Sequence, residues 1–158
     1  MKWVKQSIHY WCPDTKEQKF LGQNVTVAIL DTGISPHPDF KGRILSFRDF
    51  SNTTGSSEKV LFSFSHFSPL IDNSGHGTHV AGILAGSGLL SSGTYAGIAP
   101  FCNLIIGKVL DQNGNGSIKN VINGIQWIRD IYTQFHIRII NISVGTRPDL
   151  SIHQNFFY

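Results

Sequence analysis

The sequence has 158 residues, of which 41% are hydrophobic and 15% are charged. This length and balance suit one globular domain and exclude a disordered chain. The formal net charge is only +3, there is no run of lysines or arginines, and no apolar run approaches the length of a bilayer span, so we expect neither a nucleic-acid nor a membrane partner.

The N-terminal stretch, residues 1–24, is mixed and polar and predicts an irregular lead-in. Its lysines are not followed by a long apolar core, so it does not resemble a signal peptide, and we expect the chain to lie in the cytoplasm. Cys12 and Cys102 are the only cysteines. They are far apart in the sequence and form no Cys-x-x-Cys pair. Two interpretations stay open: two free thiols, or a single disulfide between them.

Two strands and a long loop are expected next along the chain. Val25 to Leu30 is a nearly continuous apolar run that ends on Asp31, a pattern typical of a strand buried on both faces of a parallel sheet. Arg43 to Phe50 predicts a second, more exposed strand. Ser51 to Asp72 is rich in Ser, Thr, Phe and Pro without a clean period, which predicts a long surface loop with room for a hairpin.

The second half of the sequence alternates helical and strand patterns. Small residues recur at helical spacing after Gly77 and predict a helix that approaches the sheet closely. Asn103 to Leu110 predicts a buried strand, Ser117 is a good N-cap for an amphipathic helix up to Phe135, and Ile137 to Val144 predicts another buried strand. This order predicts βαβ units on a mostly parallel sheet, with candidate sites at the carboxyl ends of the strands.

The carboxylate of Asp31 is the first candidate for chemistry. A carboxylate at the end of a buried strand is costly unless a donor pairs with it. A neutral histidine Nδ1–H is a suitable donor, and this pairing leaves Nε2 free as a general base. An aspartate before Thr-Gly is also common as a turn or cap residue, so on the tripeptide alone both interpretations stay open.

The second candidate is His76, which lies between Gly75 and Gly77 at the start of the expected helix. We expect the two glycines to remove side chains that would block a substrate; a histidine bound to a loop carbonyl is the alternative. His76 and His79 also form a His-x-x-His pair, but it lacks the glutamate and the spacing of a helical zinc motif. We expect no metal here, and we expect His79 to be a packed, hydrogen-bonded helix residue.

Taken together, these motifs resemble those of the subtilisin-like serine protease family (subtilases, peptidase family S8). The resemblance implies an α/β fold in which helices lie on both faces of a mostly parallel sheet. Residues 25–148 are then the N-terminal part of the peptidase domain, truncated after about the fourth strand, and residues 149–158 are an atypical tail. The motifs, in the family's order, are Asp31-Thr32-Gly33, Gly75-His76-Gly77-Thr78-His79-Val80-Ala81-Gly82, Gly97-Ile98-Ala99-Pro100, Lys108-Val109-Leu110-Asp111 and Asn141-Ile142-Ser143-Val144-Gly145.

The resemblance also implies a function, a serine endopeptidase with an Asp-His-Ser mechanism. Asp31 matches the aspartate that orients the histidine, and His76 matches the general base. An extended polypeptide substrate would lie as an added strand between two edge segments. Without the family, the first of these segments is simply a glycine-rich turn. The two segments are Gly114, Asn115 and Gly116 on one side and Ser143, Val144 and Gly145 on the other.

Two parts of the family's machinery are not found in this sequence. There is no Gly-Thr-Ser motif for the nucleophile and no asparagine in place for the oxyanion hole, and Ser143 belongs to a substrate-edge motif. We therefore expect the chain alone to be an inactive fragment, and a separate C-terminal half that carries the nucleophile is a candidate partner. Asp39 resembles one calcium ligand of some relatives, but one ligand is not a site, and we expect no cofactor.

Two alternatives come from other classes of protein. A retroviral-type aspartic protease would use Asp31 in a homodimer, with Leu104-Ile105-Ile106-Gly107 as its second segment, but that family is nearly all β and gives His76 no role. A non-catalytic half-domain would bind extended peptides without cutting them, or would complement a chain that carries the serine.

Overall fold

The structure is a computed structural model that describes residues 2–8, 10, 20–51, 60–61 and 71–145. Most of the long loop expected at 51–72 and the tail expected at 149–158 lie outside the described residues. Within the described part of the chain, five strands form one sheet in the order β3-β2-β4-β1-β5.

Four of these strands are parallel to one another and carry the fold. They are β1 (Thr26–Asp31), β2 (Ile44–Asp49), β4 (Asn103–Lys108) and β5 (Ile137–Ile142). The short strand β3 (Val60–Leu61) pairs antiparallel with β2. Every residue of β1 is buried, because this strand lies between β4 and β5 and is covered on both faces. The predictions of a buried first strand and of a more exposed second strand are confirmed.

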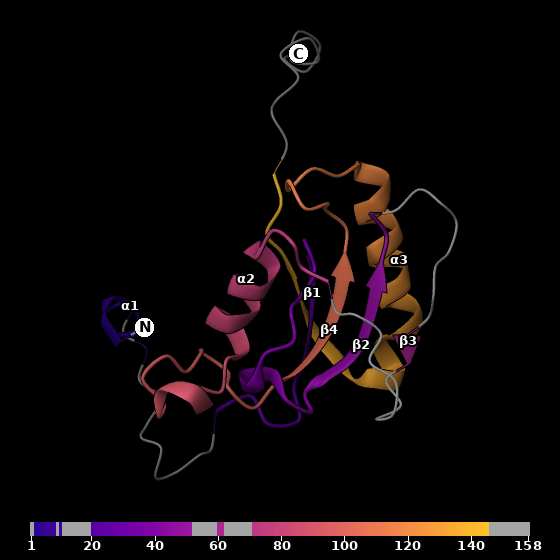
Figure 1. The fold of residues 1–158 in the computed structure, drawn as a ribbon. Coiled ribbons are helices and arrows are strands. Elements are labelled where there is room, and N and C mark those ends of the chain that lie inside the picture. The colour runs from indigo at the N-terminus through magenta and orange to yellow at the C-terminus, as the bar shows by residue number, and fades with distance from the viewer. Residues whose placement is uncertain (1, 9, 11–19, 52–59, 62–70, 146–158) are drawn as a thin grey trace, which may run out of the picture.

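The two long helices cover opposite faces of this sheet (Figure 1). Helix α2 (His76–Ala85) contributes Ala81 and Ala85 to one core cluster, together with alternate residues of β1 and β4. Helix α3 (Ile118–Phe135) contributes Trp127 and Ile128 to a second cluster with the intervening residues of the same strands. The predicted α/β fold, with helices on both faces of a mostly parallel sheet, is confirmed.

The start of α3 follows the sequence prediction in detail. The Ser117 hydroxyl accepts a hydrogen bond from the backbone N–H of Asn120 at 3.2 Å, which satisfies one of the free amides at the helix start. The helix ends at Phe135, and the C-cap residue His136 adopts a left-handed conformation with φ of 51°. None of the helices in the described part of the chain combines the length and apolarity that a membrane crossing requires.

Two expectations were wrong. The lead-in contains a short helix, α1 (Lys2–Ser7), where an irregular segment was expected. The strand expected at Ile137 to Val144 is buried only at Ile137: Ile139 is 53% exposed, and Ile140 and Ile142 are 43% and 41% exposed. The reason is position, since β5 is an edge strand that pairs with β1 alone among the described strands. A run of isoleucines indicates a strand but does not distinguish a central strand of a sheet from an edge strand.

Candidate active site

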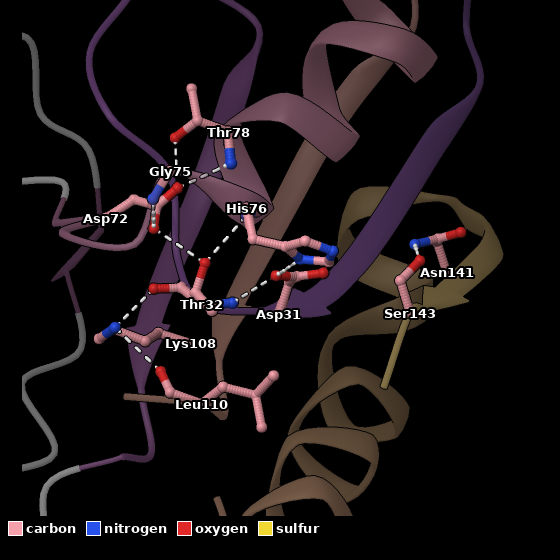
Figure 2. A network of polar contacts seen from close by, with 11 residues as sticks. Asp31, Thr32, Asp72, Gly75, His76, Thr78, Lys108, Leu110, Asn141 and Ser143 are labelled. Atoms are coloured by element: carbon pink, nitrogen blue, oxygen red, sulfur yellow. Dashed lines mark hydrogen bonds and ion pairs between the residues drawn. The ribbon is translucent and has the colours of Figure 1, made fainter. Parts of the chain in front are cut away.

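The site lies where the carboxyl end of β1 meets the N-terminus of α2. Asp31, the last residue of β1, is fully buried, whereas the side chain of His76, the first residue of α2, is about half exposed (51%). His76 Nδ1 lies 2.7 Å from Asp31 Oδ1, and Figure 2 shows the ring directly beside the carboxylate. The structure thus brings together the two residues that the sequence singled out for chemistry.

Close backbone contact makes this arrangement possible. A Cβ on Gly77 would collide with the carbonyl oxygen of Gly33, and a Cβ on Gly33 would collide with the carbonyl oxygen of Ile71. Gly75 has open space around it but adopts φ of 83°, a conformation that favours glycine. The glycines around His76 were expected to clear room for a substrate. Gly77 instead lets the first turn of α2 pack directly on the turn after β1.

The Asp31 carboxylate fixes the histidine tautomer. Oδ1 accepts a hydrogen bond from the backbone N–H of Thr32 at 2.7 Å in addition to its contact with His76. Because a carboxylate only accepts hydrogen bonds, His76 Nδ1 must be the donor, and Nε2 is left with its lone pair. Asp31 Oδ2 is buried and has no hydrogen-bond partner among the described residues.

The environment of His76 favours its protonated form. The hydrogen bond to Asp31 and then the negative charge of Asp31 raise the pKa of His76 above its ordinary value, with a smaller contribution from the charge of Asp72. Partial burial opposes this shift but does not cancel it. A histidine held in this way can take up a proton at Nε2, which is the property that a general base requires.

Asp72 is a residue of the site that the sequence analysis missed. Its buried carboxylate accepts from Thr32 Oγ1 at 2.8 Å and Gly75 N at 2.9 Å, and from Thr78 N at 2.8 Å and Thr78 Oγ1 at 2.5 Å. Burial alone would raise the pKa of Asp72, but these hydrogen bonds, led by those from Thr78, outweigh it and hold the pKa below its ordinary value. The only sequence signal is an acidic residue shortly before a helix start, which complements the positive end of the helix dipole.

Lys108 is a second residue that sequence analysis left without a role. It is 6% exposed, and its Nζ donates to the carbonyl oxygen of Thr32 at 2.5 Å and to that of Leu110 at 2.9 Å. Lys108 lies opposite Asp31 in the register of β1 and β4. Its ammonium therefore joins the chain segments that leave the ends of these two neighbouring strands.

The first predicted substrate edge lies in the turn after β4. Gly114, Asn115 and Gly116 are exposed there, and Gly114 has φ of 77°. The Asp111 carboxylate closes the turn by accepting from Asn113 N at 2.8 Å and from Asn115 N at 2.9 Å. Because β1 and β4 are parallel, this turn lies at the same edge of the sheet as Asp31. Its role in binding a substrate stays a prediction.

The second predicted edge follows β5 at that same end of the sheet. Ser143 and Gly145 are exposed and Val144 is partly buried. Ser143 Oγ accepts a hydrogen bond from Asn141 Nδ2 at 2.8 Å (Figure 2). The central strand β1 therefore ends on Asp31, and its two neighbours β4 and β5 are followed by the first and the second edge.

The other candidate residues have mixed outcomes. His79 is exposed on α2, so the expectation that it is packed was wrong. The Asp39 carboxylate accepts from the backbone N–H of Gly88 at 3.0 Å and of Leu90 at 3.5 Å, so it anchors the loop after α2. Within the described ranges, no group of three or more His, Cys, Asp or Glu side chains could hold a metal ion. Cys102 is a buried free thiol, and Cys12 lies outside the described residues.

The aspartic-protease alternative does not fit these observations. Its nearly all-β architecture differs from the parallel sheet flanked by α2 and α3. The partner of Asp31 is His76, a residue to which that alternative gives no role.

Comparison with known proteins gives a consistent result. The model of the Subtilase family matches residues 22–155. Serine protease AprX of Bacillus subtilis is 44% identical over 110 residues, which cover 70% of this chain and 22% of that protein. Subtilisin E of Bacillus subtilis is 37% identical over 134 residues, which cover 84% of this chain and 30% of that protein. This chain therefore spans less than a third of the length of these two relatives.

Solved structures show the same likeness. The structure of the Clostridium perfringens CspB protease superimposes with a TM-score of 0.68 at 26% identity, covering 82% of this chain and 30% of that one. The structure named Sphericase gives a TM-score of 0.66 at 29% identity, covering 82% of this chain and 40% of that one.

Proposed function

This chain belongs to the subtilase family, and we propose that it forms the N-terminal part of a serine endopeptidase domain. The observation that carries the proposal is the hydrogen bond of 2.7 Å between His76 Nδ1 and Asp31 Oδ1. Asp31 orients the imidazole ring and stabilises its charge once it is protonated. His76 Nε2 removes the proton from a serine hydroxyl as that oxygen attacks the peptide carbonyl, and it then delivers the proton to the leaving amine.

We propose an extended polypeptide as the substrate class. The turn at 114–116 and the segment at 143–145 follow the strands on either side of β1, so they flank the Asp31–His76 pair. An extended peptide between them would add to the protein as a strand, with main-chain hydrogen bonds supplying affinity.

The serine in this mechanism comes from outside the 158 residues. The sequence contains no Gly-Thr-Ser motif, and Ser143 is engaged with Asn141 after β5. We therefore infer that this chain alone does not hydrolyse peptides and that a C-terminal half carrying the nucleophile completes the site. The exposed isoleucines of the edge strand β5 support such a partner, because an apolar edge of this kind is normally covered.

Mixing experiments test this proposal. The purified chain is combined with a separately expressed C-terminal part of the AprX catalytic domain, and hydrolysis of a casein-type substrate is followed with and without a serine-directed fluorophosphonate. We expect hydrolysis only in the mixture, and we expect His76→Ala to abolish it while the exposed control His79→Ala leaves it. Hydrolysis by the chain alone, or hydrolysis in the mixture that survives His76→Ala, would overturn the proposal.

The second candidate is a half-domain that binds extended peptides without cutting them. It is favoured by the exposure of residues 114–116 at the edge of the sheet where β1 ends. Peptide binding that is unchanged by His76→Ala, together with no hydrolysis in any mixture, would support it over the endopeptidase.

A further inference from the structure

Asp31 and His76 come from two different elements, so their hydrogen bond depends on how those elements are joined. Asp31 is fixed by its place at the end of the central strand β1. His76 is the first residue of α2. The N-cap of this helix is Gly75, which has no side chain that could cap it. The free amides of the first turn must find their partners elsewhere.

Two side chains from outside α2 accept hydrogen bonds from three N–H groups at the start of this helix. The Asp72 carboxylate accepts from the N–H groups of Gly75 and Thr78, at 2.9 and 2.8 Å. The Thr32 hydroxyl accepts from the N–H of Gly77 at 2.9 Å. Thr32 directly follows Asp31, so the chain that carries the aspartate also caps the helix that carries the histidine.

The two threonines and Asp72 form a reciprocal junction. Thr32 Oγ1 donates to Asp72 Oδ1 at 2.8 Å, and Thr78 Oγ1 donates to Asp72 Oδ2 at 2.5 Å. Each hydroxyl also accepts an amide from the opposite segment: Thr32 from Gly77 in α2, and Thr78 from Ser35 after β1 at 2.9 Å. Figure 2 shows Thr32 at the centre of this network, with Asp72 and Thr78 on one side and the Asp31–His76 pair on the other.

Thr32 has no remaining freedom in this arrangement. Its side chain is 1% exposed, its backbone N–H donates to Asp31, and its carbonyl oxygen accepts from Lys108. A buried junction in which every polar group is satisfied permits one geometry, and a junction with one hydroxyl removed leaves buried groups unpaired.

We propose that Asp72, acting through the hydroxyl of Thr32, is a positioning residue that sets the distance between Asp31 and His76. The inference rests on the proposed role of His76, but it concerns the geometry of the pair and not the cleavage of peptides. Its readout is therefore the ionisation of the His76 ring, which is measured whether or not the chain hydrolyses anything.

Among the described residues, the charges that act on His76 are those of Asp31 from β1 and Asp72 from the segment before α2. A variant that removes the charge of Asp72 changes the pKa of His76 directly as well as through position. The informative variant is therefore Thr32→Val, which keeps both carboxylates and removes only the hydroxyl. Thr32→Ser keeps the hydroxyl and is its matched control.

The experiment is a proton NMR titration of His76 in the full 158-residue chain. In the wild-type chain and in Thr32→Ser, we expect a raised pKa and a downfield Nδ1–H signal from the bond to Asp31. In Thr32→Val, we expect the pKa to fall toward its ordinary value and the downfield signal to broaden or disappear. Asp72→Asn should lower the pKa further, whereas Asp130→Asn, which removes an exposed charge of α3, should not change it.

Two outcomes would overturn the inference. One is a Thr32→Val chain with the wild-type pKa and Nδ1–H signal, because the hydroxyl would then only stabilise the fold. The other is a Thr32→Ser chain that loses the Nδ1–H signal as fully as Thr32→Val does. Both outcomes can be observed even where Asp72→Asn fails to fold. Asp31→Asn separates the proposals: if it lowers the pKa while Thr32→Val does not, the Asp31–His76 pair stands and the positioning role of Asp72 falls.

Discussion

Gly77 packs against the backbone of Gly33 so closely that a Cβ on Gly77 would collide with the carbonyl oxygen of Gly33. This contact joins the turn after β1 to the first turn of α2 and brings Asp31 within hydrogen-bonding distance of His76. The geometry of the pair thus depends on a close approach of main chains as much as on the side chains of Asp31 and His76.

Substitutions of glycines in α2 test this contact. Gly77→Ala places a Cβ against the carbonyl oxygen of Gly33, so we expect a loss of at least about 2 kcal/mol in the free energy of unfolding. Gly82→Ala in the same helix meets nothing within 4 Å, and it should stabilise the chain by about 0.5 to 1 kcal/mol because alanine is the better helix former. Urea unfolding measures both, and equal effects of the two variants would contradict the packing described.

The pH dependence of stability should follow the two shifted groups. The pKa of Asp72 is lowered in the folded chain, so its contribution is present above its unfolded pKa of about 3.9 and is lost as the pH falls through the folded value. The pKa of His76 is raised, so its contribution is complete below about 6.5 and is lost as the pH rises through the folded value.

The pH dependence of stability is measured by urea unfolding midpoints from acid to mildly alkaline pH. Asp72→Asn should flatten the acid limb of the wild-type profile, and His76→Gln should flatten the limb above neutral pH. Asp130→Asn, an exposed carboxylate on α3, is the control and should leave the acid limb in place. An acid limb that persists unchanged in Asp72→Asn would show that another group causes it.

The thiol of Cys102 should be unreactive in the folded chain. Cys102 is fully buried, and burial raises the pKa of its thiol although the nearby Arg43 guanidinium partly opposes this. In a Cys12→Ser chain, a thiol reagent should modify Cys102 at no more than about one thousandth of the rate in urea, because only the unfolded fraction reacts. Fast modification of the folded chain would mean that the core around β4 opens locally.

The exposed edge of β5 predicts self-association. Ile139 is 53% exposed on this edge strand, and a lysine there should reduce association while changing stability by less than about 0.5 kcal/mol. Ile118 on α3 is 74% exposed but lies outside the sheet, so Ile118→Lys should leave association unchanged. Sedimentation velocity at several concentrations measures the association of the wild-type chain, Ile139→Lys and Ile118→Lys. Equal association of these three proteins would exclude β5 as the interface.

The sequence anticipated the parts of the structure that depend on local pattern. The buried strand before Asp31, the Ser117 cap and the small-residue face of α2 each follow from periodicity or from one residue type, and all are confirmed. The role of Asp72 does not follow from such patterns, since its partners Thr32 and Thr78 lie 40 and 6 residues away along the chain. The position of β5 at an edge likewise depends on strand order, which a single apolar run does not encode.

The hydrogen bond and the negative charge of Asp31 raise the pKa of His76. A direct test is an NMR titration of the His76 ring in the wild-type chain and in Asp31→Asn, which keeps the size of the side chain and removes its charge. We expect a pKa above the ordinary value in the wild-type chain and a lower pKa with loss of the downfield Nδ1–H signal in the variant. An unchanged pKa in Asp31→Asn would contradict this expectation.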